Sequence, residues 1–283
     1  MKTKLNIETG PFNIGVTVHT PETCNDKKCA VFYLHGGGLL YGERDDLPQP
    51  YIRAFMDAGY TLYCLDYPLA PEVSLTTINE TIFQLWKNLV NGEVREAGIE
   101  KYFLFGRSAG AYLALVLAKN IKSDEALTQP AGILDFYGYY EMTAPFLTEK
   151  SVYYNTLPAV SEQMEEKFRG KEPVTTGPKN LRFALYVYGR QQGRWGHLLG
   201  EEDIKASENS LSEEDIQKLP PIFITASSSD QDVPFRISKL LSRKAPSAVM
   251  KTVYYLEHDF DRDTSNPIGK EIYTECIKWM KNL

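Results

Sequence analysis

The stretch YFLFGRSAG at residues 102–110 decides the fold of this chain. Its first four residues are apolar and predict a buried strand, and the residues from Ala109 onward predict a helix. Between the two lies a G-x-S-x-G sequence centred on Ser108. In a sharp strand-to-helix turn of this kind the serine is strained, and little room remains for neighbouring Cβ atoms. The turn would expose Ser108 at the carboxyl end of a sheet, with a helix N-terminus behind it.

Short apolar runs alternate with longer amphipathic stretches on both sides of this turn. Such near-continuous apolar runs are typical of a parallel sheet that helices cover on both faces. The pattern predicts an α/β fold with a mostly parallel, doubly wound sheet, to which an N-terminal hairpin of residues 4–8 and 12–19 adds antiparallel strands. We expect the main strands at residues 30–34, 60–65, 102–105, 131–136, 222–226 and 251–256, and helices at 48–58, 73–90, 109–119, 235–244 and 269–283.

Residues 138–219 interrupt this alternation. Loops in compact α/β units are usually about 2–6 residues long, so a stretch of this length predicts an inserted, structured cap. Helical patterns at 162–169 and 212–218 support that interpretation. We therefore expect an α/β core of residues 1–137 and 220–283, with a cap or lid region of residues 138–219.

Composition and charge exclude several classes of protein. The 283 residues include 31 Lys and Arg against 37 Asp and Glu, a net charge of −6, which disfavours nucleic acid as a partner. We see no signal peptide and no apolar run near the roughly 18 residues of a membrane span, so we expect a cytoplasmic protein without stable membrane insertion. No metal site is expected, because the four cysteines form no CxxC and pair with no nearby His: Cys24, Cys29, Cys64 and Cys276.

A second glycine motif follows the first parallel strand. Residues 35–38 read HGGG, directly after the strand that ends at Leu34. Consecutive glycines let the backbone turn its N–H groups inward, although a flexible loop would also be rich in glycine. We expect the N–H groups of Gly37 and Gly38, together with that of Ala109, to form an oxyanion hole.

A serine hydroxyl is a poor nucleophile and needs a base. The chain has four histidines, of which His19 and His35 precede Ser108 and His197 lies in the cap. In this architecture the base follows both the serine and the acid in the chain. Only His258, directly after the last predicted strand, satisfies that order, so we assign it as the general base and then the general acid.

Two carboxylates compete for the role of the acid. The strand at 222–226 leads into SSSDQDVP, which contains Asp230 and Asp232. Asp230 lies closer to the end of the strand, so we assign it to orient His258 and to stabilise the imidazolium. Asp232 lies just before a predicted helix, where we expect it to cap free N–H groups.

With these motifs in order, the chain resembles the α/β-hydrolases, and more narrowly the hormone-sensitive-lipase-like esterases of the alpha/beta hydrolase fold-3 group. The family's HGGG is residues 35–38, its GDSAG elbow is residues 106–110, and its DYRLAPE segment is residues 66–72, here DYPLAPE. The resemblance covers the catalytic core but not the cap. It implies hydrolysis of carboxylic esters through a covalent acyl-enzyme, with no metal or organic cofactor.

Two residues depart from the family pattern. Arg107 replaces the Asp of the elbow, and Pro68 replaces the Arg of DYRLAPE. Arg107 thereby reverses a charge beside Ser108, and we expect it to pair with a local acid such as Asp66 or Glu72. These changes bear on substrate preference more than on mechanism.

Tyrosines concentrate after the fourth parallel strand. An aromatic ring with a polar tip suits a ligand pocket, although each ring also suits packing within the cap. We expect Tyr41, Tyr137, Tyr139 and Tyr188 to bind substrate in an aromatic cleft over Ser108. Arginines and a histidine cluster near Trp195 in the cap, and we expect surface salt bridges rather than an anion site from this group of four: Arg182, Arg190, Arg194 and His197.

The sequence therefore predicts a serine hydrolase that cleaves esters of small to medium acyl chains. Amide, peptide or formamide hydrolysis by the same triad is an alternative, and a non-catalytic binder on a hydrolase fold is less favoured because all three triad members are present. The expected partner is a small-molecule ester, and a homodimer is left open.

Overall fold

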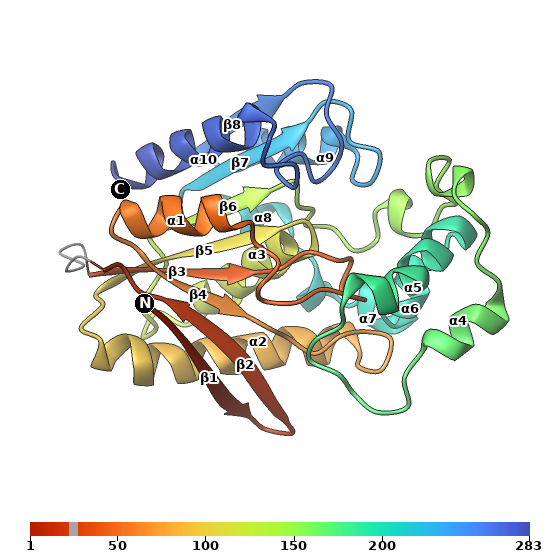
Figure 1. Cartoon of the computed structure of the whole chain (residues 1–283), viewed down its shortest axis with the longest axis horizontal. Coiled ribbons are helices and arrows are strands. Elements are labelled where there is room, and N and C mark those ends of the chain that lie inside the picture. The colour runs from red at the N-terminus through yellow and green to blue at the C-terminus, as the bar shows by residue number, and fades with distance from the viewer. Residues whose placement is uncertain (23–27) are drawn as a thin grey trace.

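A computed structural model describes residues 1–22 and 28–283, so Cys24 lies outside the described residues. One eight-stranded sheet forms the centre, with the strand order β1-β2-β4-β3-β5-β6-β7-β8. The hairpin strands β1 and β2 are antiparallel to their neighbours, and the remaining strands are parallel (Figure 1). The strands are β1 Lys2–Thr9, β2 Phe12–His19, β3 Cys29–Leu34, β4 Thr61–Leu65, β5 Lys101–Arg107, β6 Gly132–Phe136, β7 Ile222–Ser227 and β8 Ala248–Val253. The predicted α/β architecture with a mostly parallel sheet is confirmed.

The sheet is buried on both faces because its central strands are apolar at consecutive positions. In β5, Tyr102 and Leu104 pack into one core and Phe103 and Phe105 into the other, as the alternation of side chains along a strand requires. One core is covered by α2 (Leu75–Leu89), α3 (Ala109–Lys122) and α9 (Phe235–Lys244), and the other by α1 (Gln49–Asp57) and α10 (Pro267–Met280).

The last strand lies three residues earlier than the apolar run at 251–256 predicted. Strand β8 pairs with β7 from Ala248 to Val253 and ends where β7 ends. Tyr254 and Tyr255 follow it in a loop and are exposed. Because β8 is the edge strand and only partly buried, its limits follow from pairing with β7 and not from apolar continuity.

Most of the chain between β6 and β7, called the cap from here on, forms a layer beyond the carboxyl ends of the parallel strands (Figure 1). Its helices are α4 Glu162–Phe168, α5 Lys179–Gln192, α6 Trp195–Leu198, α7 Glu201–Lys205 and α8 Glu213–Gln217. The last of them, α8, packs against α9 on the core. The sequence patterns did not identify α5, since several of its polar residues, among them Arg182, Arg190 and Gln191, are buried and obscure the apolar period.

Candidate active site

Ser108 lies in the turn between β5 and α3, with a backbone conformation that L-residues rarely adopt. Its φ of 53° and ψ of −119° place it in a strained region that the surrounding structure must hold. The two glycines of the motif are required by close packing. A Cβ at Gly106 would clash with the backbone of Gly110, and a Cβ at Gly110 would clash with the carbonyl of Leu34. Close packing in this turn therefore requires glycine at both of these positions.

Ser108, His258 and Asp230 form one hydrogen-bonded chain. The Nε2 atom of His258 lies 2.8 Å from Ser108 Oγ, and its Nδ1 lies 2.7 Å from Asp230 Oδ2. An ionised carboxylate only accepts hydrogen bonds, so Nδ1 carries a proton and the neutral ring presents its Nε2 lone pair to the serine hydroxyl. The structure brings together the three residues that the sequence indicates. His258 lies 28 positions after Asp230 and 150 positions after Ser108 in the chain.

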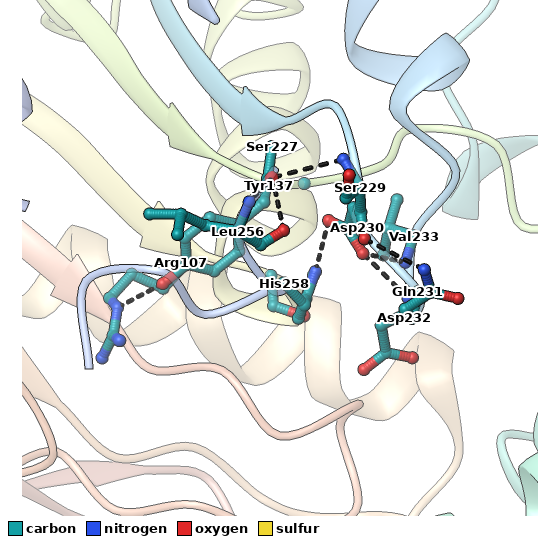
Figure 2. Close-up of polar contacts among 12 residues, drawn as sticks. Arg107, Tyr137, Ser227, Ser229, Asp230, Gln231, Asp232, Val233, Leu256 and His258 are labelled. Carbon is teal, nitrogen blue, oxygen red and sulfur yellow. Dashed lines mark hydrogen bonds and ion pairs between the residues drawn. The ribbon is translucent and has the colours of Figure 1, made fainter. Parts of the chain in front are cut away.

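Asp230 is held by the backbone of its own loop. Its Oδ1 atom accepts the N–H groups of Asp232 and Val233 at 2.8 and 2.9 Å, which leaves Oδ2 for His258 (Figure 2). The side chain of Asp230 is almost fully buried, with 1% exposed. Asp230 is thus oriented by three donors, and it is the acid that contacts His258.

Ser227 fastens the loop that carries His258, a role that the sequence patterns did not reveal. At the end of β7, its Oγ donates to the carbonyl of Leu256 at 2.5 Å and accepts the N–H of the same residue at 3.1 Å (Figure 2). Leu256 precedes His258 by two residues. The ends of β7 and β8 are thereby tied together directly beside the acid and the base.

The surroundings of His258 favour its protonated form. Burial alone would lower the pKa of this imidazole, but the adjacent carboxylate of Asp230, together with the charges of Asp232 and Asp259, raises it to about 9. The ring of Tyr137 packs edge-on against His258, with centroids 4.7 Å apart. An imidazolium formed at this position would be stabilised by Asp230.

The predicted oxyanion residues lie beside Ser108. Gly37 and Gly38 line the same cavity as Ser108, and Ala109 is the first residue of α3. A Cβ at Gly36 would lie 3.1 Å from the carbonyl oxygen of Arg107 and 3.4 Å from Ser108 Cβ, so the glycine loop runs directly against the elbow. Backbone N–H groups in this arrangement can stabilise an oxyanion that forms on a substrate bound at Ser108.

Arg107 is the centre of a buried polar network. Its Nη2 lies 2.8 Å from Asp261 Oδ1, and its Nε donates to the hydroxyl of Tyr137 at 2.7 Å. Tyr137 and Tyr273 both donate to Asp261, which is fully buried. Burial lowers the pKa of Arg107, but Asp261, together with Tyr137, Tyr33 and Asp46, more than offsets this effect and raises the pKa well above its usual value, so the guanidinium stays charged. Arg107 also reaches Asp46 at 3.4 Å.

The expected pairing of Arg107 with Asp66 or Glu72 is therefore wrong. Asp66 binds Arg44 instead, and Glu72 binds Arg182 at 2.7 Å. Both acids follow β4, in a segment that turns toward the hairpin and the cap, whereas Asp261 comes from the loop of His258. The true partner lies 154 positions away in the chain, beyond the reach of a local argument.

A cavity of about 640 Å³ opens over Ser108 and His258. Its wall is aromatic on the cap side and carries charged groups at several points. The aromatic residues that line it are Tyr41, Tyr137, Tyr153, Tyr154, Phe183 and Tyr186, and the charged ones are Glu43, Asp46, Arg107, Lys179, Asp232, Glu257, Asp259 and Arg262. Tyr41 and Tyr137 lie where the sequence analysis expected them.

Tyr139 and Tyr188 do not line this cavity, contrary to expectation. Tyr139 is fully buried and stacks on Tyr112, with ring centroids 5.3 Å apart. Tyr188 faces a second, smaller hollow on the cap and accepts a hydrogen bond from Arg194. Both tyrosines serve packing because the backbone directs them away from Ser108, whereas Tyr186, two residues before Tyr188 on α5, points into the cavity.

Asp232 joins the cap to the core and does not cap α9. Its carboxylate lies 2.5 Å from Arg190 Nη1, and the hydroxyls of Tyr186 and Tyr154 donate to it at 2.6 and 3.0 Å. The N-cap residue of α9 is Pro234, whose side chain makes no capping hydrogen bond. The expected capping role of Asp232 is wrong because the carboxylate turns toward the cap arginine.

The arginines near Trp195 divide into two kinds. Arg182 and Arg190 are buried, so the expected surface pairing is wrong for them. Arg194 and His197 are partly exposed and pair with Glu162 and Glu201, as expected for a solvated face. Buried guanidinium groups occur here because each meets a carboxylate from the core.

Within the part of the chain that the structure describes, no cluster of three His, Cys, Asp or Glu side chains has the arrangement of a metal site. Across the same residues, none of the helices has both the length and the hydropathy needed to cross a bilayer.

Comparison with known proteins identifies the class. The model of a family described as alpha/beta hydrolase fold matches residues 31–236, and the chain therefore belongs to this family, in the fold-3, hormone-sensitive-lipase-like group that the motifs indicated. A solved alpha/beta hydrolase superfamily protein from Enterococcus faecalis is 34% identical over 99% of both chains, with a TM-score of 0.84. A Staphylococcus aureus protein described as of unknown function is 29% identical, with a TM-score of 0.89 over 100% of this chain and 98% of that one.

Other relatives share only part of the chain or only the fold. An ethyl acetate hydrolase from Pseudomonas putida is 29% identical over 36% of this chain and 32% of its own length. A non-reducing polyketide synthase from Penicillium brasilianum is 28% identical over 48% of this chain, which spans 6% of that much longer protein. An esterase from Pyrobaculum calidifontis has the same fold at 19% identity, with a TM-score of 0.72 over 100% of this chain and 83% of that one.

Proposed function

We propose that this protein is a serine hydrolase that cleaves carboxylic esters of small to medium acyl chains through an acyl-enzyme on Ser108. The observation that carries the proposal is the unbroken hydrogen-bonded chain from Asp230 through His258 to Ser108, which opens into a cavity beside the glycine loop. Family membership and the ethyl acetate hydrolase relative add support. A cavity of about 640 Å³ is in the range that accommodates a small-molecule substrate.

In the first half-reaction, Ser108 Oγ attacks the ester carbonyl carbon while His258 Nε2 takes the hydroxyl proton. The carbonyl π electrons move to the oxygen, and the N–H groups of Gly37, Gly38 and Ala109 stabilise the resulting oxyanion. The intermediate then collapses: the C–O bond to the alcohol breaks, and the imidazolium donates its proton to the departing oxygen. Asp230 stabilises the imidazolium throughout.

In the second half-reaction, water attacks the acyl carbon and His258 removes its proton. The second tetrahedral intermediate releases the carboxylic acid and restores Ser108, with the proton returned from His258. Every proton in this cycle passes through Nε2, so the tautomer that Asp230 enforces is essential to it.

The test is a panel of p-nitrophenyl acetate, butyrate and longer esters with matched anilides, assayed on the wild type and on Ser108→Ala. We expect the wild type to hydrolyse the short esters, with loss of activity by a factor of about 10⁶ in the variant, the scale on which nucleophile removal acts in serine hydrolases. Thermal melting of Ser108→Ala serves as the folding control.

Two outcomes would contradict the proposal. Turnover of the anilides with none of the esters would indicate an amide hydrolase that uses the same triad. A folded wild type that hydrolyses neither class and does not react with a fluorophosphonate probe would indicate a binding protein on a hydrolase fold.

A further inference from the structure

The glycine loop at residues 36–38 holds its expected oxyanion donors by binding the carbonyl on the other side of each peptide. In a trans peptide, the C=O of one residue and the N–H of the next point in opposite directions, so a bond to the carbonyl aims the N–H. Gly36 O accepts from His35 Nδ1 at 2.7 Å, which aims the N–H of Gly37. Gly37 O accepts the N–H groups of Leu40 and Tyr41 at 3.0 and 3.1 Å, which aims the N–H of Gly38.

The next peptide, between Gly38 and Leu39, carries no expected oxyanion donor, but the cap holds it and thereby fixes Gly38 from its carbonyl side. Trp195, at the start of α6, donates its indole Nε1–H to Gly38 O at 2.9 Å, and the bond is buried. The ring of Tyr186 from α5 fills the space that a Cβ on Gly38 would occupy. Gly38 is therefore fixed on its carbonyl side by one cap residue and on its Cα by another, although it lies 157 positions from Trp195 in the chain.

The rest of the loop is also bound to the cap. Arg182 Nε donates to Leu40 O at 2.7 Å, while its charge is balanced by Glu72. Gly42 and Gly177 exchange two backbone hydrogen bonds, at 2.7 and 2.9 Å, as an isolated antiparallel bridge. With the Trp195 bond, the cap is hydrogen-bonded to this loop at three alternate residues, Gly38, Leu40 and Gly42.

The indole of Trp195 is itself held in one orientation. It is 1% exposed, and the rings of Tyr186, Tyr139 and Phe146 pack edge-on against it, with centroids 5.0 to 5.8 Å away. The guanidinium of Arg190 lies 5.0 Å from its ring centroid. The enclosing rings hold the indole with its N–H directed at Gly38 O.

We infer that Trp195 is a positioning residue of the oxyanion hole, and that the cap completes the catalytic apparatus instead of only covering it. The inference rests on the proposed function, because an oxyanion hole matters only if an acyl transfer occurs at Ser108. It assigns to the cap a contribution to the transition state that the catalytic triad and glycine motif do not include.

The test is Trp195→Phe, which keeps a buried aromatic ring and removes the N–H donor. Trp86→Phe on α2 is the matched control, since Trp86 is also 1% exposed but packs against Phe83 and Tyr102 and makes no bond to the glycine loop among the contacts of the described residues. With p-nitrophenyl butyrate we expect kcat to fall roughly tenfold in Trp195→Phe, less than the about 10²–10³-fold lost when an oxyanion donor itself is removed. We expect KM to change by less than about twofold, because the ground-state ester makes little use of the hole.

Two further readouts separate this role from general damage. Inhibition by a trifluoromethyl ketone, which forms a tetrahedral adduct on serine, should weaken by the same factor as kcat. The acidic limb of the pH profile should stay in place, because His258 and Asp230 are untouched. Trp86→Phe should match the wild type in all three measurements.

Equal kcat values for Trp195→Phe and Trp86→Phe would overturn the inference while leaving the proposed function intact. A wild type without turnover on any ester would overturn the proposed function and this inference with it. If melting shows that Trp195→Phe does not fold, Arg182→Lys replaces it, since this variant keeps a charge beside Glu72 but removes the Nε donor to Leu40. An unchanged kcat in that variant would overturn the inference that the cap completes the catalytic apparatus.

Discussion

His258 combines two environments that act in opposite directions on its proton. Burial favours the neutral ring that the proposed general base must have, whereas Asp230 favours the imidazolium that forms in the proposed mechanism. Asp230, together with the charges of Asp232 and Asp259, outweighs burial and raises the pKa of His258 to about 9. These surroundings therefore stabilise the imidazolium of His258 more than its neutral ring.

The pH profile should report this balance. Because the proposed mechanism uses neutral His258 as the base, kcat/KM for p-nitrophenyl acetate should rise with pH, with an acidic limb well above the ordinary histidine value of 6.5 and near 9. Asp230→Asn removes the charge that raises the pKa and leaves burial, which lowers it, so the limb should move to lower pH. The maximal rate should also fall by about 10⁴-fold, since the correct tautomer is no longer enforced. A limb that does not move would show that Asp230 does not set the pKa of His258.

At the scale of elements, the elbow and the loop of His258 are joined beneath the site by Arg107 and Asp261. These residues lie one position before Ser108 and three after His258, so the pair ties the two loops to each other. Asp261 has no exposed surface, and its neighbours Tyr137 and Tyr273 are buried as well. A carboxylate in this position depends on the guanidinium for its charge balance.

Arg107→Met should therefore destabilise the fold by about 3–5 kcal/mol, the cost of leaving a buried charge unpaired. Urea unfolding measures the loss. The double variant Arg107→Met with Asp261→Asn should recover a large part of it, because the unpaired charge is then gone.

Lys28→Met, which breaks an exposed pair with Glu100, is the control and should hardly change stability. If the double variant were no more stable than Arg107→Met alone, the ion pair would not be the reason for the loss.

At the scale of the whole molecule, Arg190 and Asp232 join the cap to the core. The guanidinium lies 2.5 Å from the carboxylate, and the rings of Phe146, Tyr154, Tyr186 and Trp195 surround it. Asp232 lies in the same loop as Asp230 and donates its own N–H to it. The cap is thereby connected to the loop that carries the acid.

Arg190→Met should release the cap from this loop. We expect a loss of about 3–5 kcal/mol from the unpaired Asp232 carboxylate, measured by urea unfolding, and faster proteolysis within residues 138–219. Adding Asp232→Asn should reverse part of both effects. Arg194→Met, next to the same cluster but in a partly exposed pair, should leave both measurements close to the wild type. Equal proteolysis of the Arg190 and Arg194 variants would contradict a role for Arg190 in holding the cap.

The features that the sequence predicts correctly are mostly those that depend on residues close together in the chain. The elbow, the glycine loop and the alternation of strands and helices depend on residues close together in the chain, and each appeared in the structure at or near its predicted position. His258 and Asp230 were selected by order and elimination, and the structure places both within hydrogen-bond distance of their expected partners. By contrast, β8 lies three residues before its predicted position, and no sequence pattern indicates α5. Asp232 binds Arg190 and not the N-terminus of α9.

The sequence by itself determined the α/β architecture and the three residues that meet in the hydrogen-bonded chain, because strained turns and buried strands require particular residue types at short spacing. Only the tertiary structure decided what Arg107, Arg190 and Trp195 do. Their partners lie 154, 42 and 157 positions away. A buried charge or indole N–H must find an acceptor, but which acceptor it finds depends on how distant segments pack, and no local pattern records that.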